Sequence, residues 1–201
     1  MTQRLGIFGG TFDPPHVGHV VAALNVKHAL GLDLVTLMVA GEPWQKTSEG
    51  NVESAVDRLE MTRAAIAGLP GLIAGDDEVR RHGPTFTIDT LETLSRTQPD
   101  TELFTIVGAD AARSLTTWHR WQDIALLSTL VVVSRDATTP MAENNFDGVR
   151  VMIANIDASS SEVRGRIRNG QSVDTLVAPS VIKIINERNL YRAVNDTTEY
   201  R

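Results

Sequence analysis

The amino-acid sequence predicts an α/β protein with a doubly wound parallel sheet, helices on both faces of that sheet and a small helical C-terminal part. Short apolar segments alternate with amphipathic helical segments over most of the 201 residues, which is typical of parallel strands joined by helices. The segment 129–134 is nearly all apolar, as expected for a central strand covered on both faces. Beyond the last apolar segment only helical patterns follow, and they predict the C-terminal part.

These patterns place the elements in chain order. Strands are expected at residues 5–8, 34–39, 72–74, 103–107, 129–134 and 149–153, with a further extended segment at 78–80. Helices are expected at residues 16–30, 54–67, 87–94, 160–168 and 181–188. We expect one domain over residues 1–191 and a polar tail at 192–201 whose composition favours disorder.

The bulk composition restricts the class of partner. With 42% hydrophobic residues the chain can bury a substantial core, and its net charge of −6 disfavours a broad nucleic-acid-binding surface. No apolar run approaches the ~20 residues that span a bilayer, and the start of the chain shows no signal-peptide pattern. The absence of cysteine excludes disulfides and thiol chemistry and fits a cytoplasmic location. A small ligand is the expected partner.

A group of small and polar residues directly follows the first strand. In doubly wound sheets, ligands bind beyond the carboxyl ends of strands where the strand order reverses. Gly9 and Gly10 allow a sharp turn and a close approach of an anion to main-chain amides, and Thr11 adds a hydroxyl. His16 and His19 share one face of the first turn of a helix, whose free amides favour phosphate.

Other interpretations of these residues are an ordinary turn, a zinc site and capping histidines. A glycine pair after a strand is most often only a turn. Two histidines at this spacing are compatible with zinc, but no third ligand stands near them in the sequence. All the residues together, between a strand and a helix, favour phosphate binding.

The segment 9–19 resembles the signature of nucleotidyltransferases that have a Rossmann-like sheet and an H-x-G-H element. It is most similar to that of the bacterial nicotinate mononucleotide adenylyltransferases. The resemblance implies that His16 and His19 are catalytic and that Asp13 contacts the mononucleotide. It also implies an ATP site that includes Gly9, Gly10, Thr11, Phe12, His16 and His19.

The segment 83–91 resembles a second motif of that family, a hydroxyl and an aromatic residue followed by T-I-D-T-L. By itself the segment is a helix start with Thr87 as the N-cap, which explains the residues without a ligand. The resemblance implies that Thr85, Phe86 and Thr87 bind the mononucleotide, with backbone amides near the latter two holding the nicotinate carboxylate.

Two further segments, G-A-D at residues 108–110 and W-H-R-W at residues 118–121, also resemble family motifs. Gly108 permits close approach of a ligand, and Asp110 can accept hydrogen bonds from a ribose or help to place a cation. Trp118 offers a flat face for a pyridine ring, although a tryptophan in the core is the alternative. We assign Gly108 and Asp110 to the ATP site and Trp118 to the mononucleotide site.

Two cations are weaker candidates for the mononucleotide phosphate. Lys46 follows the second strand in P-W-Q-K, where the family usually has proline, histidine and then lysine, so an exposed loop lysine is an equal alternative. Arg135 lies just past the fifth strand.

The segment 159–164 follows the sixth strand and opens a helix. It resembles the family motif I-S-S-T-x-x-R, with Ser161 in place of threonine. Hydroxyls and free amides suit an anion there, and Arg164 can hold two phosphate oxygens. The alternative is a simple helix cap, but we assign Ser160, Ser161 and Arg164 to ATP.

The resemblance implies transfer of AMP from ATP to nicotinate mononucleotide, which gives nicotinate adenine dinucleotide and pyrophosphate. Mg²⁺ is expected to arrive with ATP, without a dedicated protein metal site. Alternatives are adenylyl or cytidylyl transfer to another acceptor, such as nicotinamide mononucleotide or phosphopantetheine, and a nucleotide sensor without catalysis. Nucleic-acid and membrane partners are not expected, and a homo-oligomer is compatible with the sequence.

Overall fold

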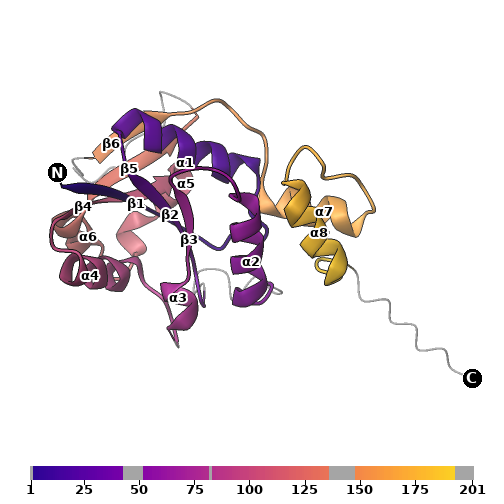
Figure 1. The fold of residues 1–201 in the computed structure, drawn as a ribbon, viewed down its shortest axis with the longest axis horizontal. Helices are drawn as coiled ribbons and strands as arrows, with labels where there is room; N and C mark the ends of the chain where they lie inside the picture. The colour runs from indigo at the N-terminus through magenta and orange to yellow at the C-terminus, as the bar shows by residue number, and fades with distance from the viewer. Residues whose placement is uncertain (1, 43–51, 82, 136–147, 193–201) are drawn as a thin grey trace, which may run out of the picture.

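A single parallel sheet forms the centre of the computed structural model, which describes residues 2–42, 52–81, 83–135 and 148–192. Its strand order is β3-β2-β1-β4-β5-β6, with every neighbouring pair parallel (Figure 1). The strands are β1 (Gln3–Gly10), β2 (Leu34–Val39), β3 (Leu72–Gly75), β4 (Thr101–Gly108), β5 (Thr129–Ser134) and β6 (Gly148–Met152). The order reverses between β1 and β4, so the doubly wound topology is confirmed.

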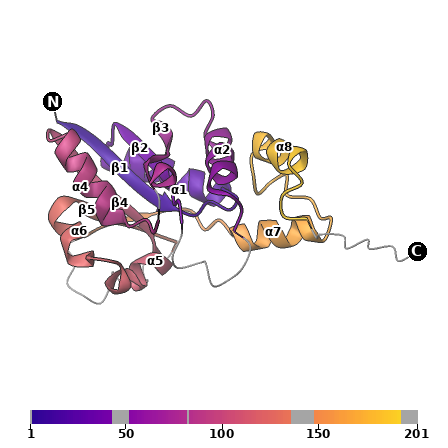
Figure 2. The ribbon, with the colours of Figure 1, turned by 90° about the horizontal axis from the view of Figure 1, so that it is seen from below.

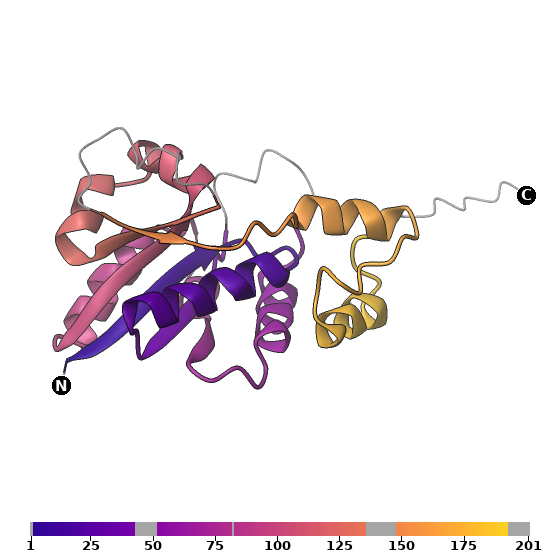
Figure 3. The same cartoon turned by 90° about the horizontal axis from the view of Figure 1, so that it is seen from above.

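Helices cover both faces of the sheet because alternate strand residues point to opposite sides. On one face, Phe8 of β1 packs in a cluster with α1 (Val17–Leu30) and α2 (Ala55–Ala65). On the other face, Ile7 packs against α4 (Thr87–Thr97) and α6 (Trp121–Leu127), while α5 (Ala109–Arg113) covers β4 and β5. Figure 3 shows α1 and α2 together on one side of the sheet.

Most expected elements are present, and the differences are confined to short helices. Residues 77–80 form a short helix, α3 (Asp77–Arg80), so the extended segment expected at 78–80 was wrong. The short helices α5 and α6 were not expected, because each buries a single residue and therefore gives no helical period. The segment Leu115–Thr117 adds one 3₁₀ turn between them.

The C-terminal part consists of α7 (Ser160–Arg168) and α8 (Pro179–Glu187), beside α2 and away from the middle of the sheet (Figure 2). Its apolar residues form a separate cluster that includes Met61 of α2. We call this the C-terminal cluster; its buried members are Met61, Val163, Val173, Val177, Val181, Ile185, Leu190 and Tyr191. The single domain over 1–191 stays a prediction, and tail residues 193–201 lie outside the described part.

Among the described residues, none of the helices combines the length and the apolar character needed to cross a membrane.

Candidate active site

A cavity of about 280 Å³ lies at the carboxyl edge of the sheet, beyond β1, β2 and β4. It coincides with the reversal in strand order, as the topology predicts. The cavity brings together these residues that the sequence indicated: Gly9, Gly10, Thr11, Phe12, His19, Thr85, Phe86, Thr87, Gly108, Trp118 and Ser160. Its remaining lining was not expected from the sequence: Ala40, Glu78, Val107, Ala111 and His119.

Three glycines shape the wall of this cavity. A Cβ atom added to Gly9 or Gly108 would meet no atom within 4 Å, so the missing side chains leave space that a ligand can use. At Gly10 a Cβ would lie 2.7 Å from the Phe12 ring. Phe12 itself is buried and has a positive φ of 51°, which turns the chain sharply after β1.

The two histidines stand at the start of α1 with their ring centroids 3.8 Å apart. His16 is the N-cap residue, and its backbone N–H donates to Nδ1 of His19 over 3.2 Å. That bond requires an unprotonated Nδ1, so neutral His19 carries its proton on Nε2. His19 lines the cavity and also packs edge-on against Phe12 at 5.0 Å, whereas His16 lies behind it, outside the lining.

Burial makes His16 a weak base. Only 7% of the residue is exposed, and its Nδ1 has no hydrogen-bond partner among the described residues. Burial, with a smaller effect from the charge of Arg135, lowers the pKa of His16 to about 4. His16 is therefore neutral at pH 7 and can offer at most one N–H to a ligand.

The lowered pKa predicts a loss of stability in acid. Between pH 6.5 and about 4 the unfolded chain binds a proton at His16 that the folded chain does not, so acidification favours unfolding. The free energy of unfolding should fall by roughly 3 kcal/mol across this window from this residue alone. Urea unfolding of the wild type and of His16→Gln, at neutral pH and near pH 4, measures it. An equal acid-induced loss in both proteins would contradict the assignment to His16.

The start of α4 forms another part of the wall. Its N-cap residue is Phe86 rather than Thr87, and no side chain caps the helix, so the expected Thr87 cap was wrong. Phe86 has extended backbone angles, and Thr87 is already the first helical residue. Since Thr85, Phe86 and Thr87 all line the cavity, the uncapped amides of this helix start lie beside it.

Aromatic rings stand beside the helix start. Trp118 is half-buried, packs against the apolar clusters on this face of the sheet, and has a buried Nε1–H without a partner in the described part of the chain. Trp118 therefore packs against the core and also lines the cavity, so the core position does not prevent contact with a ligand. The ring of exposed His119 lies 4.5 Å from that of Phe86, a contact for which the sequence contains no signal.

Glu78 is the acidic residue that sequence reasoning missed. It lies in α3, is 7% exposed and accepts a hydrogen bond from Thr90 Oγ1 over 3.1 Å. Burial raises the pKa of Glu78, and the bond from Thr90 opposes that rise. The Thr90 contact ties α3 to the first turns of α4, so this carboxyl stabilises the wall that the helix start forms.

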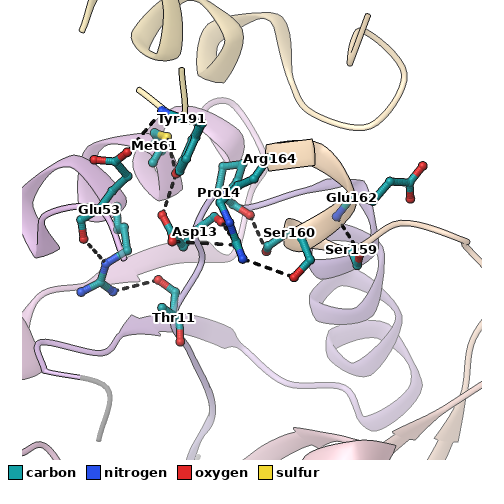
Figure 4. Close-up of polar contacts among 12 residues, drawn as sticks. Thr11, Asp13, Pro14, Glu53, Met61, Ser159, Ser160, Glu162, Arg164 and Tyr191 are labelled. Carbon is teal, nitrogen blue, oxygen red and sulfur yellow. Dashed lines mark hydrogen bonds and ion pairs between the residues drawn. The ribbon is translucent and has the colours of Figure 1, made fainter. Parts of the chain in front are cut away.

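The segment that opens α7 lies against the turn after β1 (Figure 4). Ser160 Oγ donates to the carbonyl of Pro14 over 2.9 Å, and Arg164 Nη1 donates to the carbonyl of Asp13 over 2.7 Å. Arg164 Nη2 also donates to Ser161 Oγ over 3.3 Å. Two segments almost 150 residues apart in sequence are thus side by side, with Ser160 in the cavity lining.

The cap interpretation of this segment is confirmed, and its role in ATP binding stays a prediction. The hydroxyl of Ser159 accepts from the backbone N–H of Glu162 over 3.1 Å, as a helix N-cap does.

Like His16, Ser161 and Arg164, three further candidates lie outside the cavity lining. Asp13 is 3% exposed, and its carboxylate contacts the C-terminal part rather than the cavity. The Asp110 side chain is 95% exposed and pairs with Arg113 on the same short helix. Arg135 is exposed and outside the lining. Lys46 lies outside the described residues.

In the described part of the chain no group of three or more His, Cys, Asp or Glu side chains is arranged to hold a metal ion.

Comparison with known proteins gives consistent results. The family model of cytidylyltransferase-like proteins matches residues 7–166. A protein of Dehalococcoides mccartyi strain 195, named probable nicotinate-nucleotide adenylyltransferase, is 39% identical to this chain over 95% of this chain and 98% of its own length. A protein of the same name from Thermus thermophilus is 38% identical over 94% of this chain and 100% of its own length. A solved structure of Plasmodium falciparum nicotinic acid mononucleotide adenylyltransferase with NaAD has a TM-score of 0.76 over 94% of this chain and 97% of that one, at 19% identity. That last likeness concerns the fold.

Proposed function

We propose that this chain, which belongs to the nicotinate-nucleotide adenylyltransferases within the cytidylyltransferase-like family, transfers AMP from ATP to nicotinate mononucleotide. The observation that carries the proposal is one shared cavity. Its lining includes the glycine turn after β1, His19 and Ser160, and it also includes the start of α4 and Trp118. One end of this space therefore suits a triphosphate, and the other suits an aromatic ring with a carboxylate.

The reaction is a phosphoryl-centre displacement. An oxygen of the acceptor's 5′-phosphate forms a bond to the α-phosphorus of ATP, and the bond from that phosphorus to the bridging oxygen of the β-phosphate breaks. Nicotinate adenine dinucleotide and pyrophosphate result. The attacking phosphate is ionised at pH 7, so no general base is needed, and the protein acts by positioning and by stabilising charge.

The charge develops on phosphate oxygens, and this chain offers donors for them. His19, whose neutral ring has its proton on Nε2, lines the cavity together with Gly9 and Thr11. At the start of α7 the Ser160 hydroxyl donates to Pro14 and the Glu162 amide to Ser159, so the donors for a second group on the same side are the amides of Ser160 and Ser161, the Ser161 hydroxyl and Arg164. Mg²⁺ bound to ATP would neutralise part of the triphosphate charge, using phosphate oxygens and water as ligands.

The acceptor end takes its character from α4 and the aromatic residues. The first amides of α4 attract a carboxylate, because they have no intrahelical partner and stand at the positive end of the helix dipole. Trp118 and His119 bound the same space with aromatic surface. This pairing favours nicotinate over nicotinamide mononucleotide. The homo-oligomer and the cytoplasmic location stay predictions.

Pyrophosphate release tests the proposal. The purified protein is supplied with MgATP and, in separate reactions, nicotinate mononucleotide, nicotinamide mononucleotide or phosphopantetheine. Release should be fastest with nicotinate mononucleotide, and chromatography should identify the dinucleotide. Faster release with another acceptor would reassign the substrate, and ATP binding without release in any reaction would indicate a sensor.

A further inference from the structure

The turn at residues 11–14 forms part of the cavity wall, yet it belongs to no helix or strand. Its main chain is held by a buried guanidinium. Arg58 of α2 is 1% exposed and donates to the carbonyl of Thr11 over 2.8 Å, to that of Gly41 over 2.9 Å and to that of Glu53 over 2.9 Å. A cation buried on three carbonyls needs a nearby negative charge.

Asp13 supplies that charge. Burial lowers the pKa of Arg58, and the carboxylate of Asp13 opposes this effect. A second cation, Arg164, has its Nη1 3.9 Å from Asp13 Oδ2 and donates to the Asp13 carbonyl. The carboxylate of Asp13 thus interacts with both Arg58 and Arg164. Each of these arginines donates a hydrogen bond to a backbone carbonyl of the turn.

The direct hydrogen bond to this carboxylate comes from the far end of the chain. Tyr191 Oη donates to Asp13 Oδ1 over 2.7 Å, across 178 residues of sequence (Figure 4). Tyr191 is 8% exposed in the C-terminal cluster, and its backbone N–H donates to the Glu53 carboxylate over 3.2 Å. Burial and the neighbouring Asp13 raise the pKa of Tyr191, so its hydroxyl remains a donor.

The backbone at Tyr191 is unusual for its residue type. Its φ is 62°, in the left-handed region that a bulky L-residue rarely adopts. Such a conformation persists where surrounding contacts stabilise it. Here they are the apolar packing of the C-terminal cluster and the two hydrogen bonds, which together aim the hydroxyl at Asp13.

We infer that Tyr191 is a positioning residue for adenylyl transfer, which orients Asp13 and thereby keeps the turn at residues 11–14 in place at the triphosphate end of the cavity. This inference rests on the proposed function. Without the hydroxyl, the carboxylate of Asp13 can rotate toward either arginine, and the turn loses its fixed geometry. Among the described residues, no hydrogen bond of this network involves α4 itself, so the acceptor end should change less than the triphosphate end.

Tyr191→Phe tests the inference, since it removes only the hydroxyl. We expect the Kd for ATP, measured by calorimetric titration without acceptor, to rise about tenfold, the scale of a lost hydrogen bond to a charged group. The kcat/KM for ATP should fall by a similar factor, while the KM for nicotinate mononucleotide changes less than about twofold. Unchanged ATP affinity in a folded Tyr191→Phe protein would overturn the inference.

Thr105→Val is the matched control for a merely structural effect. The Thr105 hydroxyl is also buried, shares a 2.6 Å hydrogen bond with Ser128, and lies within β4 away from the turn. This variant should lose stability but bind ATP as the wild type does. If Tyr191→Phe behaves in the same way, Tyr191 only stabilises the fold.

Asp13→Asn tests the same link from its other end if Tyr191→Phe does not fold. It removes the charge and keeps the size of the side chain, and it should also raise the Kd for ATP. Wild-type affinity would overturn the inference. ATP binding is measured without turnover, so a wild-type protein that binds ATP but releases no pyrophosphate would contradict the proposed function and leave the positioning test valid.

Discussion

His19→Ala is expected to lower turnover by roughly two or more orders of magnitude while the protein keeps its fold, the scale for losing a donor that stabilises developing charge. The Nδ1 of His19 accepts from the backbone N–H of His16, so the proton of the neutral ring stands on Nε2. His19 is half-buried, and its truncation removes ring contacts with Phe12 and His16 and one hydrogen bond at the start of α1, so some stability should be lost without loss of the fold. Steady-state kcat with nicotinate mononucleotide measures the effect, and circular dichroism checks the fold.

Two further variants sharpen this test. His28 stands on the same helix and is exposed, so His28→Ala should retain full turnover. His19→Gln places an amide N–H near the position of Nε2 and should recover part of the lost activity. Near-normal turnover of His19→Ala would remove this residue from the mechanism.

Gly108→Val is expected to weaken ATP binding by on the order of 10- to 100-fold, equivalent to the ~1–3 kcal/mol that overpacking of a filled site costs. Gly108 has φ −71° and ψ 160°, which any residue adopts, so the free protein should fold normally. A side chain there enters the open space of the cavity. Calorimetric titration with ATP gives the affinity, and thermal unfolding gives the stability.

Gly165→Val provides the comparison for this prediction. Gly165 also has no atom within 4 Å of an added Cβ, but it lies within α7 and outside the cavity lining. Valine there should change stability slightly and leave ATP affinity unchanged. If both valine variants bind ATP like the wild type, the space beside Gly108 is not the nucleotide site.

Elements with strong local signals were predicted nearly to the residue. The strands at 34–39 and 129–134 and the helix at 160–168 have the bounds that their apolar runs and cap signals indicate. Local physics decides these elements, because a buried parallel strand requires an apolar run and a helix start requires groups for its free amides. Elements such as α5 and α6, with one buried residue each, have no such signal.

The candidate site residues also differ in whether a local sequence pattern predicts their position. Gly9, Thr11 and His19 were found because a glycine turn followed by a helix start is a local pattern, and the cavity contains all three. Asp13 stands in the same pattern, but the structure turns it toward Tyr191. Glu78 was missed because its segment has too few residues to reveal a helix.

The sequence by itself determined the individual strands, the helices and the short motifs at the strand ends, since each depends on residues close together in the chain, and the alternation of strands and helices indicated the parallel sheet. Only the tertiary structure decided which motif side chains reach the cavity. Partners such as Asp13 with Tyr191, 178 residues apart, or Pro14 with Ser160, 146 residues apart, meet through chain topology and packing. No periodicity encodes such contacts, because they arise from the orientation of whole elements around the core.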